Sequence, residues 1–591
     1  MTIKITKQLA TMQDLAIGVG QVVQRRNGID LTLDKIDLAT NTEVQDRVIR
    51  VTSIAAMEAY SAPVGYVFSL NAGGRSGTFD VIDGNFFDEL GADTLNGIYV
   101  GLSDDPTATT KVLKRRFQGA VSASWFGALG NGVANDTPNI QAAFDSGAKK
   151  VALFGGSVGF LLDTTLTVPA GSSLEGSYRF IDPRSAVVFE SVIYADKVIL
   201  NSSATILLQD SASIFGLLIL RKGMVLPADA NEVALFSGTA ITIAYDSHGP
   251  FVGNSAIIGF NVAILTDNSS NTEQFRAEYL NIDCTNGLRI QNSFDIVYIE
   301  NVHCWPSASV GLASPSDADL QRSGIAFLFQ NNGDWNKLTN CFSLGYSRGV
   351  VIDSCNSVQV LNCGADYTAS RTVTTMGFEV TGTSSEASFI ACQAASQSIG
   401  FLLNPSTAAY KTAQMVGCSS WSSELSHVRV VSGALHINGG RFRGKDLSYE
   451  YGVDVQSGPV LVSGVSFENL DFAFFNRNEN NKVIYDSTCV FKSVVNIQTN
   501  PFVASVASSD PLPLPLSGQD MLVNVTGTTS FGTILNANSY HGKTIVLRFT
   551  GGLTVFDGDL KLNGDFITSV NSTLTLAASG SVFYEVARSV N

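Results

Sequence analysis

Two short patterns recur in the middle of this 591-residue chain with nearly the same spacing. In the first, a glycine precedes an apolar residue at positions Gly324, Gly349, Gly377 and Gly400. In the second, a cysteine recurs at positions Cys341, Cys363, Cys392 and Cys418. Because both series keep the same order and return after roughly 25 residues, they indicate stacked structural repeats.

Each repeat contains short runs, such as GVVID and VQVLN, in which β-branched residues alternate with period 2. This alternation is typical of β-strands. The segments between the strands vary in length whereas the strands do not, as expected when each repeat is one turn of a parallel β-helix. We therefore predict an all-β fold, a right-handed parallel β-helix (solenoid), with about 14 turns between residues 150 and 495.

The composition agrees with a solenoid and argues against several kinds of partner. Charged residues make up 15% of the chain, below the roughly 25% of ordinary soluble domains. The formal net charge of −15 argues against nucleic acid, since binding phosphates requires a basic surface. An anionic polysaccharide would need a local basic patch.

No apolar run reaches about 18 residues, so we expect no membrane span. The N-terminal segment MTIKITKQLATMQDLAIGVG lacks the regions of a signal peptide.

The eight cysteines form no CxxC pair, which argues against a zinc or redox site. Since no secretion signal precedes them, we expect free thiols buried inside the β-helix. Asp317 and Asp319 by themselves are too few carboxylates to indicate a calcium site. No metal or other cofactor is predicted.

Shifts in composition divide the chain into three regions. Residues 1–117 comprise a polar leader, in which residues 30–51 have the pattern of a short helix or a strand pair, and a mostly β module from residue 51. Residues 118–498 form the β-helix. Residues 499–591 include the stiff segment DPLPLP and then short strands with glycine turns, which predict a C-terminal antiparallel β module.

The segment WFGALGNGVANDTPNIQAAF, residues 125–144, joins a glycine-rich turn to a helix start. Asp136 and Thr137 can cap a helix that begins near Pro138. The segment resembles the motif that opens the pectate-lyase-like β-helices of phage tailspikes, where a short amphipathic helix covers the first turn. Asn131 and Asn135 stand where that motif has an acidic pair, which argues against metal binding there.

The C-terminal module resembles a β module shared by many tailspike-like proteins, through to the final residues YEVARSVN. With the motif and the repeats, the resemblance extends over most of the chain, from the opening motif to the C-terminus. It implies a homotrimer in the tail of a virion, assembled in the host cytoplasm, that recognises a bacterial capsule or O-antigen polysaccharide. It also implies that residues 1–117 anchor the chain to a tail or baseplate protein.

Residues for carbohydrate chemistry are expected in the central turns. The strings YIENVHCWP (298–306) and NGDWNKLTNCFSLGYSRGVVI (332–352) resemble segments that recur in polysaccharide-degrading tailspikes. The resemblance assigns groove or motif positions to four of their residues, His303, Trp305, Asp334 and Tyr346. His303 and Trp305 share one strand face, where a tryptophan suits either sugar stacking or a subunit contact.

Glycoside hydrolysis normally uses two carboxyl groups, one protonated and one ionised. Asp334 and Asp366 lie at opposite ends of one strand face, too far apart to meet within one chain, so we expect them to pair between adjacent subunits. Each could instead cap a turn. Glu379 is a further catalytic candidate, because its neighbours point inward and leave it outward among apolar residues, where desolvation raises a carboxyl pKa. Its alternative is an ion-paired glutamate at an interface.

Arg322, Arg348 and Arg371 recur with nearly the period of the two series, so they are candidates for a basic stripe that holds an acidic sugar. They could equally be three unrelated surface arginines. Trp335 and Tyr367, which directly follow the two candidate aspartates, complete the predicted substrate-binding set.

Three functions are compatible with these residues. The first is an endo-hydrolase that uses paired carboxylates, the second is a polysaccharide lyase with a base such as His303, and the third is a non-catalytic adhesin. Outward Asp and Glu residues and the scarcity of histidine, with five in the chain, favour the hydrolase. We therefore predict a phage tailspike that binds and cuts a bacterial surface polysaccharide.

Overall fold

The computed structural model describes residues 22–26, 29–33, 47–154, 158–177, 197–266, 271–309, 311–333, 335–368, 373–383, 385–406, 412–445, 450–477, 483–498, 503–514, 521–535 and 537–590. The chain divides into two compact units, Met1–Gln118 and Gly119–Asn591. Among the residues in these ranges, no helix has the length and hydropathy that crossing a bilayer requires.

The N-terminal unit contains a strand pair and a small sheet. Strands β1 (Val22–Arg26) and β2 (Ile29–Leu33) pair antiparallel. The five-stranded sheet has the order β3-β4-β5-β7-β6, with strands β3 (Val48–Val51), β4 (Val67–Leu70), β5 (Gly77–Asp83), β6 (Tyr99–Val100) and β7 (Lys111–Arg115). Helices α2 (Ile54–Glu58) and α3 (Phe87–Ala92) connect its strands. Met57, Phe68 and Phe79 belong to its core, so the predicted mostly β module is observed.

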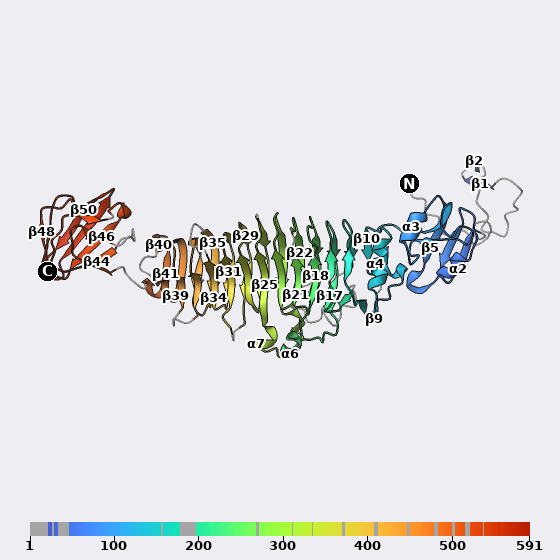
Figure 1. Ribbon diagram of the computed structural model, residues 1–591, viewed down its shortest axis with the longest axis horizontal. Helices are drawn as coiled ribbons and strands as arrows, with labels where there is room; N and C mark the ends of the chain where they lie inside the picture. The colour runs from blue at the N-terminus through green and yellow to red at the C-terminus, as the bar shows by residue number, and fades with distance from the viewer. Residues whose placement is uncertain are drawn as a thin grey trace. The chain divides into compact units, whose positions relative to one another are not determined.

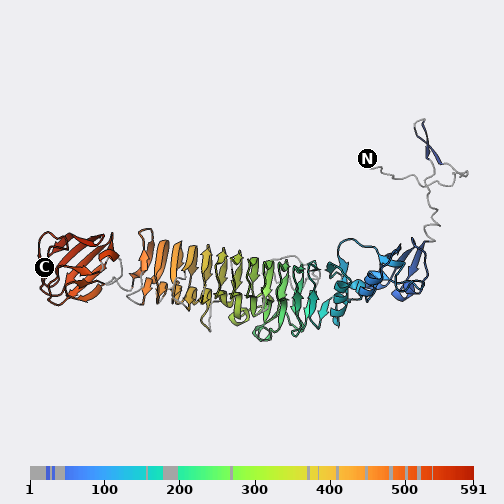
Figure 2. The same cartoon turned by 45° about the horizontal axis from the view of Figure 1, so that its top comes forward.

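The larger unit contains a parallel β-solenoid of about 15 turns, which confirms the predicted fold class (Figure 1). Its strands run from β8 (Val121–Ser122) to β41 (Val490–Gln498), and the pairings that stack its turns are parallel. Each turn contributes to three sheets, here called A, B and C in chain order, and the stacked turns are visible in a second view (Figure 2). A parallel ladder of this kind buries the strands between their neighbours above and below.

The central turns position the candidate site. In these turns sheet A contains β26 (Lys337–Thr339), β29 (Val358–Leu361) and β32 (Ala387–Ile390). Sheet B contains β27 (Phe342–Leu344), β30 (Gly364–Asp366) and β33 (Gln393–Ala395). Sheet C contains β25 (Arg322–Gln330), β28 (Tyr346–Asp353), β31 (Met376–Gly382) and β34 (Ile399–Pro405). Long strands bend through both A and B in other turns, namely β22 (Arg276–Asp283), β24 (Tyr298–Cys304), β35 (Thr412–Trp421), β37 (Ala434–Arg443) and β39 (Val460–Asn476).

The cysteines are free thiols, as predicted, and seven of the eight are buried. Four of them occupy successive turns at the corner between sheets A and B, at positions Cys341, Cys363, Cys392 and Cys418. Burial raises the pKa of Cys363 well above its ordinary value and that of Cys355 to about 12. These thiols therefore act as small apolar side chains in the stacked interior.

Helix α4 (Thr137–Asp145) covers the first turns of the β-helix with buried Ile140, Ala143 and Phe144, as the motif predicts. Asp136 precedes the helix, but its carboxylate does not cap it. It accepts instead from the amides of Leu129 (2.7 Å) and Gly130 (3.1 Å). The aspartate thus holds the glycine-rich turn against the helix, a corrected role for the predicted cap.

Two long loops leave the β-helix at neighbouring places and pack together. The first, residues 222–238, contains α6 (Ala230–Val233), and the second, residues 305–321, contains α7 (Asp317–Leu320) (Figure 1). We call them the lateral loops. The Ala228 amide donates to the Ala308 carbonyl (2.7 Å), and the Ala230 amide donates to Asp319 Oδ1 (2.7 Å). Asp319 therefore holds one lateral loop against the other.

The C-terminal module has a five-stranded sheet of order β42-β44-β46-β49-β50, with strands β42 (Val503–Ala507), β44 (Met521–Thr526), β46 (Thr544–Phe549), β49 (Thr573–Ser579) and β50 (Val582–Ser589). The predicted antiparallel pairing is confirmed for β46–β49 and β49–β50, whereas β42–β44 and β44–β46 are parallel. A tight turn joins β49 to β50 at Gly580, with φ +62°. The connection between β44 and β46 is long enough to cross over and restore the same direction.

Candidate functional site

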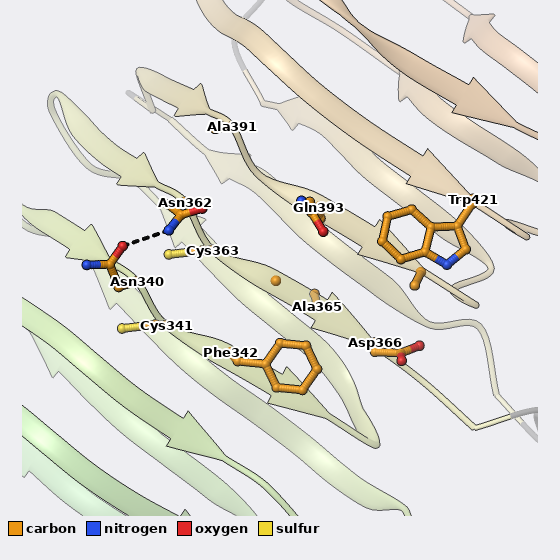
Figure 3. A pocket seen from close by; sticks show the side chains of 12 residues that line it. Asn340, Cys341, Phe342, Asn362, Cys363, Ala365, Asp366, Ala391, Gln393 and Trp421 are labelled. Carbon is orange, nitrogen blue, oxygen red and sulfur yellow. Dashed lines mark hydrogen bonds between the residues drawn. The ribbon is translucent and has the colours of Figure 1, made fainter.

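A groove of about 350 Å³ runs along sheet B and the corner that joins it to sheet A (Figure 3). Its lining comprises one carboxylate, two aromatic rings, three side-chain amides and several small residues. They are Asn340, Cys341, Phe342, Asn362, Cys363, Gly364, Ala365, Asp366, Ala391, Gln393, Ala395 and Trp421. No charged side chain other than Asp366 belongs to this described lining.

The register of sheet B explains the shape of the groove. Leu344, Asp366, Ala395 and Trp421 stand in one column on four successive turns. Only the methyl group of Ala395 separates Asp366 from Trp421 in this column, so a slot opens between the carboxylate and the indole. Turns of a parallel ladder are about 4.8 Å apart, which places the two residues roughly 10 Å apart along the β-helix.

A parallel column of outward residues forms the second side of the groove. Phe342, Gly364, Gln393 and Ser419 stand on the same four turns. A Cβ atom at Gly364 would lie 2.7 Å from the Phe342 ring, so the ring occupies the place of a side chain there. Trp421 is 40% exposed. Gln393 is also exposed, and its turn lies between those of Phe342 and Trp421.

At the corner between sheets A and B, two turns carry stacked asparagines and the next two turns carry residues without an amide side chain. Asn362 Nδ2 donates to Asn340 Oδ1 at 2.8 Å (Figure 3). Both residues have left-handed backbone, with φ of +51° and +54°, which asparagine tolerates well. The next two corner positions are Ala391 and Gly417, which carry no amide side chain.

His303 and Trp305 lie upstream of the groove and contact it through Phe342. The ring centres of His303 and Phe342 are 5.2 Å apart, those of His303 and Trp305 are 5.3 Å apart, and those of Trp305 and Phe342 are 6.3 Å apart. Trp305 Nε1 is buried without a hydrogen-bond partner among the described residues. This cluster joins the groove to the lateral loops, since Trp305 begins the second loop.

Glu379 stands outward on sheet C with Val351 and Leu402 as its register neighbours, as the sequence predicts. Its side chain is 5% exposed, and Arg348 Nε lies 3.2 Å from its Oε2 atom. Burial raises the pKa of Glu379 above its ordinary value; Arg348 opposes that rise and the nearby Asp353 adds to it. Burial prevails over the arginine because Arg348 is 39% exposed and makes no well-aligned hydrogen bond to Oε2.

A glutamine at position 379 should stabilise the protein at neutral pH. The raised pKa means that folding favours the protonated form, so this contribution is present below the unfolded-state pKa and is lost as pH rises through the folded-state value. We expect Glu379→Gln to gain about 0.5–2 kcal/mol at pH 8 and nothing at pH 4. Thermal melting at both pH values measures this difference. Arg348→Gln is the matched control and should be less stable than the wild type at pH 8; a Glu379→Gln protein that melts earlier at pH 8 contradicts the assignment.

The other predicted site residues do not form one cluster. Asp334 and Arg371 lie outside the described residues. Trp335 is 57% exposed beside the former, and Tyr367 is buried directly after Asp366. Tyr346 is also buried, and its hydroxyl donates to the Cys284 carbonyl at 2.9 Å, so it belongs to the interior and not to a groove.

The predicted arginine stripe is wrong for Arg322. Its side chain is fully buried and pairs with Asp283, with Nε to Oδ1 at 2.6 Å and Nη2 to Oδ2 at 3.0 Å. In the ladder it lies beside Tyr346 and not beside Arg348. The physical reason is the second lateral loop, which ends at this residue and folds over it.

Sequence reasoning missed Phe342, Gln393 and Trp421, although a signal for them exists. Counting three positions past each cysteine of the second series gives the column Leu344, Asp366, Ala395 and Trp421. Counting one position past each gives Phe342, Gly364, Gln393 and Ser419. The cysteine series that predicted the fold therefore also indicates which residues stand side by side along the groove.

Comparison with known proteins finds no matching family model and no similar curated protein. The search of solved structures finds matches at low identity. Phage tailspikes are among them. The gp42 tailspike of Acinetobacter phage vb_AbaP_AS12 has a TM-score of 0.39 and 10% identity, covering 91% of this chain and 90% of its own. Tailspike protein 2 of the Escherichia coli O157:H7 bacteriophage CAB120 has a TM-score of 0.42 and 11% identity, with coverages of 97% and 77%.

An enzyme is among the similar structures as well. The A-module of the Azotobacter vinelandii mannuronan C-5 epimerase AlgE4 has a TM-score of 0.40 and 12% identity, covering 64% of this chain and 97% of its own. At these identities and TM-scores the likeness assigns neither a role nor a residue to this chain. Within the described ranges, no group of three or more His, Cys, Asp or Glu side chains could hold a metal ion.

Proposed function

We propose that this chain is a phage tailspike that binds a bacterial capsule or O-antigen polysaccharide and cleaves it by endo-hydrolysis. The observation that carries the proposal is the groove, whose lining includes Asp366 on a turn between those of the aromatic residues Phe342 and Trp421. Aromatic faces can stack on sugar rings, while amides and a carboxylate bind hydroxyl groups. The resemblance of both ends of the β-helix to tailspikes supports the biological setting.

Hydrolysis requires a second carboxyl group near Asp366. Asp366 ends β30 in sheet B, and Glu379 lies in β31 of sheet C, in the same turn of the β-helix. Glu379, with its raised pKa, suits a general acid, and the more exposed Asp366 suits a base or nucleophile. Asp334 of an adjacent chain is the other proposed partner of Asp366.

The proposed assembly is a homotrimer in the virion tail. Residues 1–117 would attach the chain to a tail or baseplate protein, since they belong to a compact unit with its own core. The β-helix would present the groove to the polysaccharide. A trimer would also bring a neighbouring chain beside each groove, which a pair of carboxylates shared between subunits requires.

Incubation with a panel of purified capsules and O-antigens tests the proposal. At least one polysaccharide should bind and be shortened, as size-exclusion chromatography of the products would show. Trp421→Ala should weaken that binding by about 1–2 kcal/mol, roughly 5- to 30-fold, because it removes the stacking surface. Tyr245→Ala, at an exposed aromatic site distant in the chain, is the control. If no polysaccharide binds, the proposed function is wrong.

A non-catalytic adhesin is the second candidate, because Asp366 is the single carboxylate in the described lining of the groove. Binding without any change in polysaccharide length would favour it. A lyase would instead produce unsaturated uronates, which absorb ultraviolet light, and would direct attention to His303 as the base.

A further inference from the structure

The outward column of sheet B continues beyond the groove with charged residues. Trp421 lies beside Arg443, Arg443 beside Glu468, and Glu468 beside Lys492. The adjacent outward column places Arg441 next to Ser419. Three cations and one carboxylate therefore follow the indole on the next three turns. This arrangement is notable in a chain whose formal net charge is −15.

The two arginines of this patch differ in their partners. Arg441 donates to Glu468 Oε2 through both Nε (3.0 Å) and Nη2 (2.5 Å), and the arginine lowers the pKa of Glu468. Lys492 Nζ also lies 3.6 Å from Glu468 Oε1. The Glu468 carboxylate is therefore already paired with Arg441 and Lys492. Arg443 makes no ion pair or side-chain hydrogen bond with any described residue and is exposed.

The spacing of these residues matches a chain of sugars along the β-helix. The Asp366 carboxylate and the Trp421 indole are two turns apart, and Arg443 is one turn beyond the indole. At about 4.8 Å per turn, the distance from Asp366 to Arg443 is roughly 14 Å. A saccharide held between Asp366 and Trp421 would place its next unit near the Arg443 guanidinium.

We propose that Trp421 and Arg443 form a subsite for a carboxylated sugar at this end of the groove. This inference rests on the proposed function, since it identifies the class of polysaccharide that the groove accepts. The planar guanidinium can donate two parallel hydrogen bonds to a carboxylate. The adjacent indole supplies the apolar face for the same sugar ring or its neighbour. The local positive charge offsets the repulsion that the acidic protein otherwise exerts on an anionic chain.

Binding measurements on the full-length protein test this subsite. The panel of purified capsules and O-antigens should contain neutral members, uronate or sialate members, and members charged only by phosphate. Those that bind are expected to carry carboxylates. Arg443→Gln should weaken that binding about 10- to 100-fold, the range for a hydrogen-bonded charge pair, and should reduce its dependence on salt.

Reduction of the carboxyl groups of the bound polysaccharide to alcohols gives the sharper comparison. The reduced polymer should bind the wild type and Arg443→Gln equally, because the partner of the arginine is gone. Arg276→Gln, an exposed arginine on sheet A, is the matched control and should bind like the wild type. Binding restricted to neutral or phosphate-charged polymers, or an unchanged affinity of Arg443→Gln, overturns the inference while the proposed function stands. Failure of every polymer to bind overturns the proposed function itself.

Discussion

Replacing Asp283 by asparagine should release the lateral loops from the β-helix. Asp283 and Arg322 have no exposed side-chain surface and form a bidentate ion pair. Asp283 Oδ2 also accepts from the Ala308 amide at 2.8 Å, in the second loop. The substitution leaves a buried guanidinium without its countercharge. Removing one partner of such a pair costs about 3–5 kcal/mol.

The loss should be local because Arg322 joins both lateral loops to the β-helix. The guanidinium lies over the Phe236 ring at 5.5 Å, in the first loop, and donates to the Asp319 carbonyl at 2.9 Å, in the second. Both loops also share an apolar cluster with sheet B, formed by Leu218, Ala228, Ala256, Ile258 and Ala308. Loosening of the pair therefore affects both loops together and leaves the stacked turns intact.

Amide hydrogen exchange resolves this local effect. Exchange in residues 226–236 and 307–321 should accelerate roughly 200- to 5,000-fold in Asp283→Asn, with little change in β29 or β32. Asp163→Asn is the matched control, since Asp163 pairs with Lys222 on an exposed surface, where such pairs contribute about 0–1 kcal/mol. The double variant Asp283→Leu/Arg322→Met should recover much of the protection, because it leaves no buried charge. Unchanged loop exchange in Asp283→Asn would contradict this role.

The fold can be predicted from the sequence because a β-helix repeats the same strand pattern in every turn. Alternation within GVVID or VQVLN predicts a strand, and the cysteine series predicts the turn at which the strand recurs. The glycine series is less reliable for register. The step from Gly324 to Gly349 would align Phe327 with Ile352, whereas Phe327 pairs with Val350. An irregularity between Arg322 and Ile325, where the second lateral loop returns, causes this shift.

The site is only partly predictable for a related reason. Asp366 and Glu379 are found from their phase within the repeat, since that phase decides which way a side chain points. The burial of Arg322 depends on Asp283, from an earlier turn, and on two loops whose packing no periodicity describes. Tyr346 is similar, because its hydroxyl donates to the carbonyl of Cys284, 62 residues earlier in the sequence. Long-range contacts of this kind leave no local signal.

Asp366→Asn should remove cleavage and keep binding. The residue stands in the groove two turns from Trp421, where its carboxylate would act on a sugar that the indole holds. Losing a general acid or base typically lowers the rate about 10²- to 10⁴-fold. The asparagine amide preserves the shape of the slot, so affinity for the polysaccharide should change little. Release of reducing ends measures the rate, and Asp246→Asn, an exposed aspartate in another turn, should cleave like the wild type.

The partner of Asp366 can be identified by mixing inactive variants. If Asp334 of an adjacent chain completes the site, then refolded mixtures of Asp334→Asn and Asp366→Asn contain interfaces with both carboxylates intact. Random assembly of a trimer makes this true of roughly a quarter of the interfaces, so up to about a quarter of the wild-type rate should return. Mixtures of Glu379→Gln and Asp366→Asn distinguish the alternative: if those two residues act within one chain, no intact site can form and the mixture stays inactive. Wild-type cleavage by Asp366→Asn alone would show that the groove carboxylate is not catalytic, whichever partner is chosen.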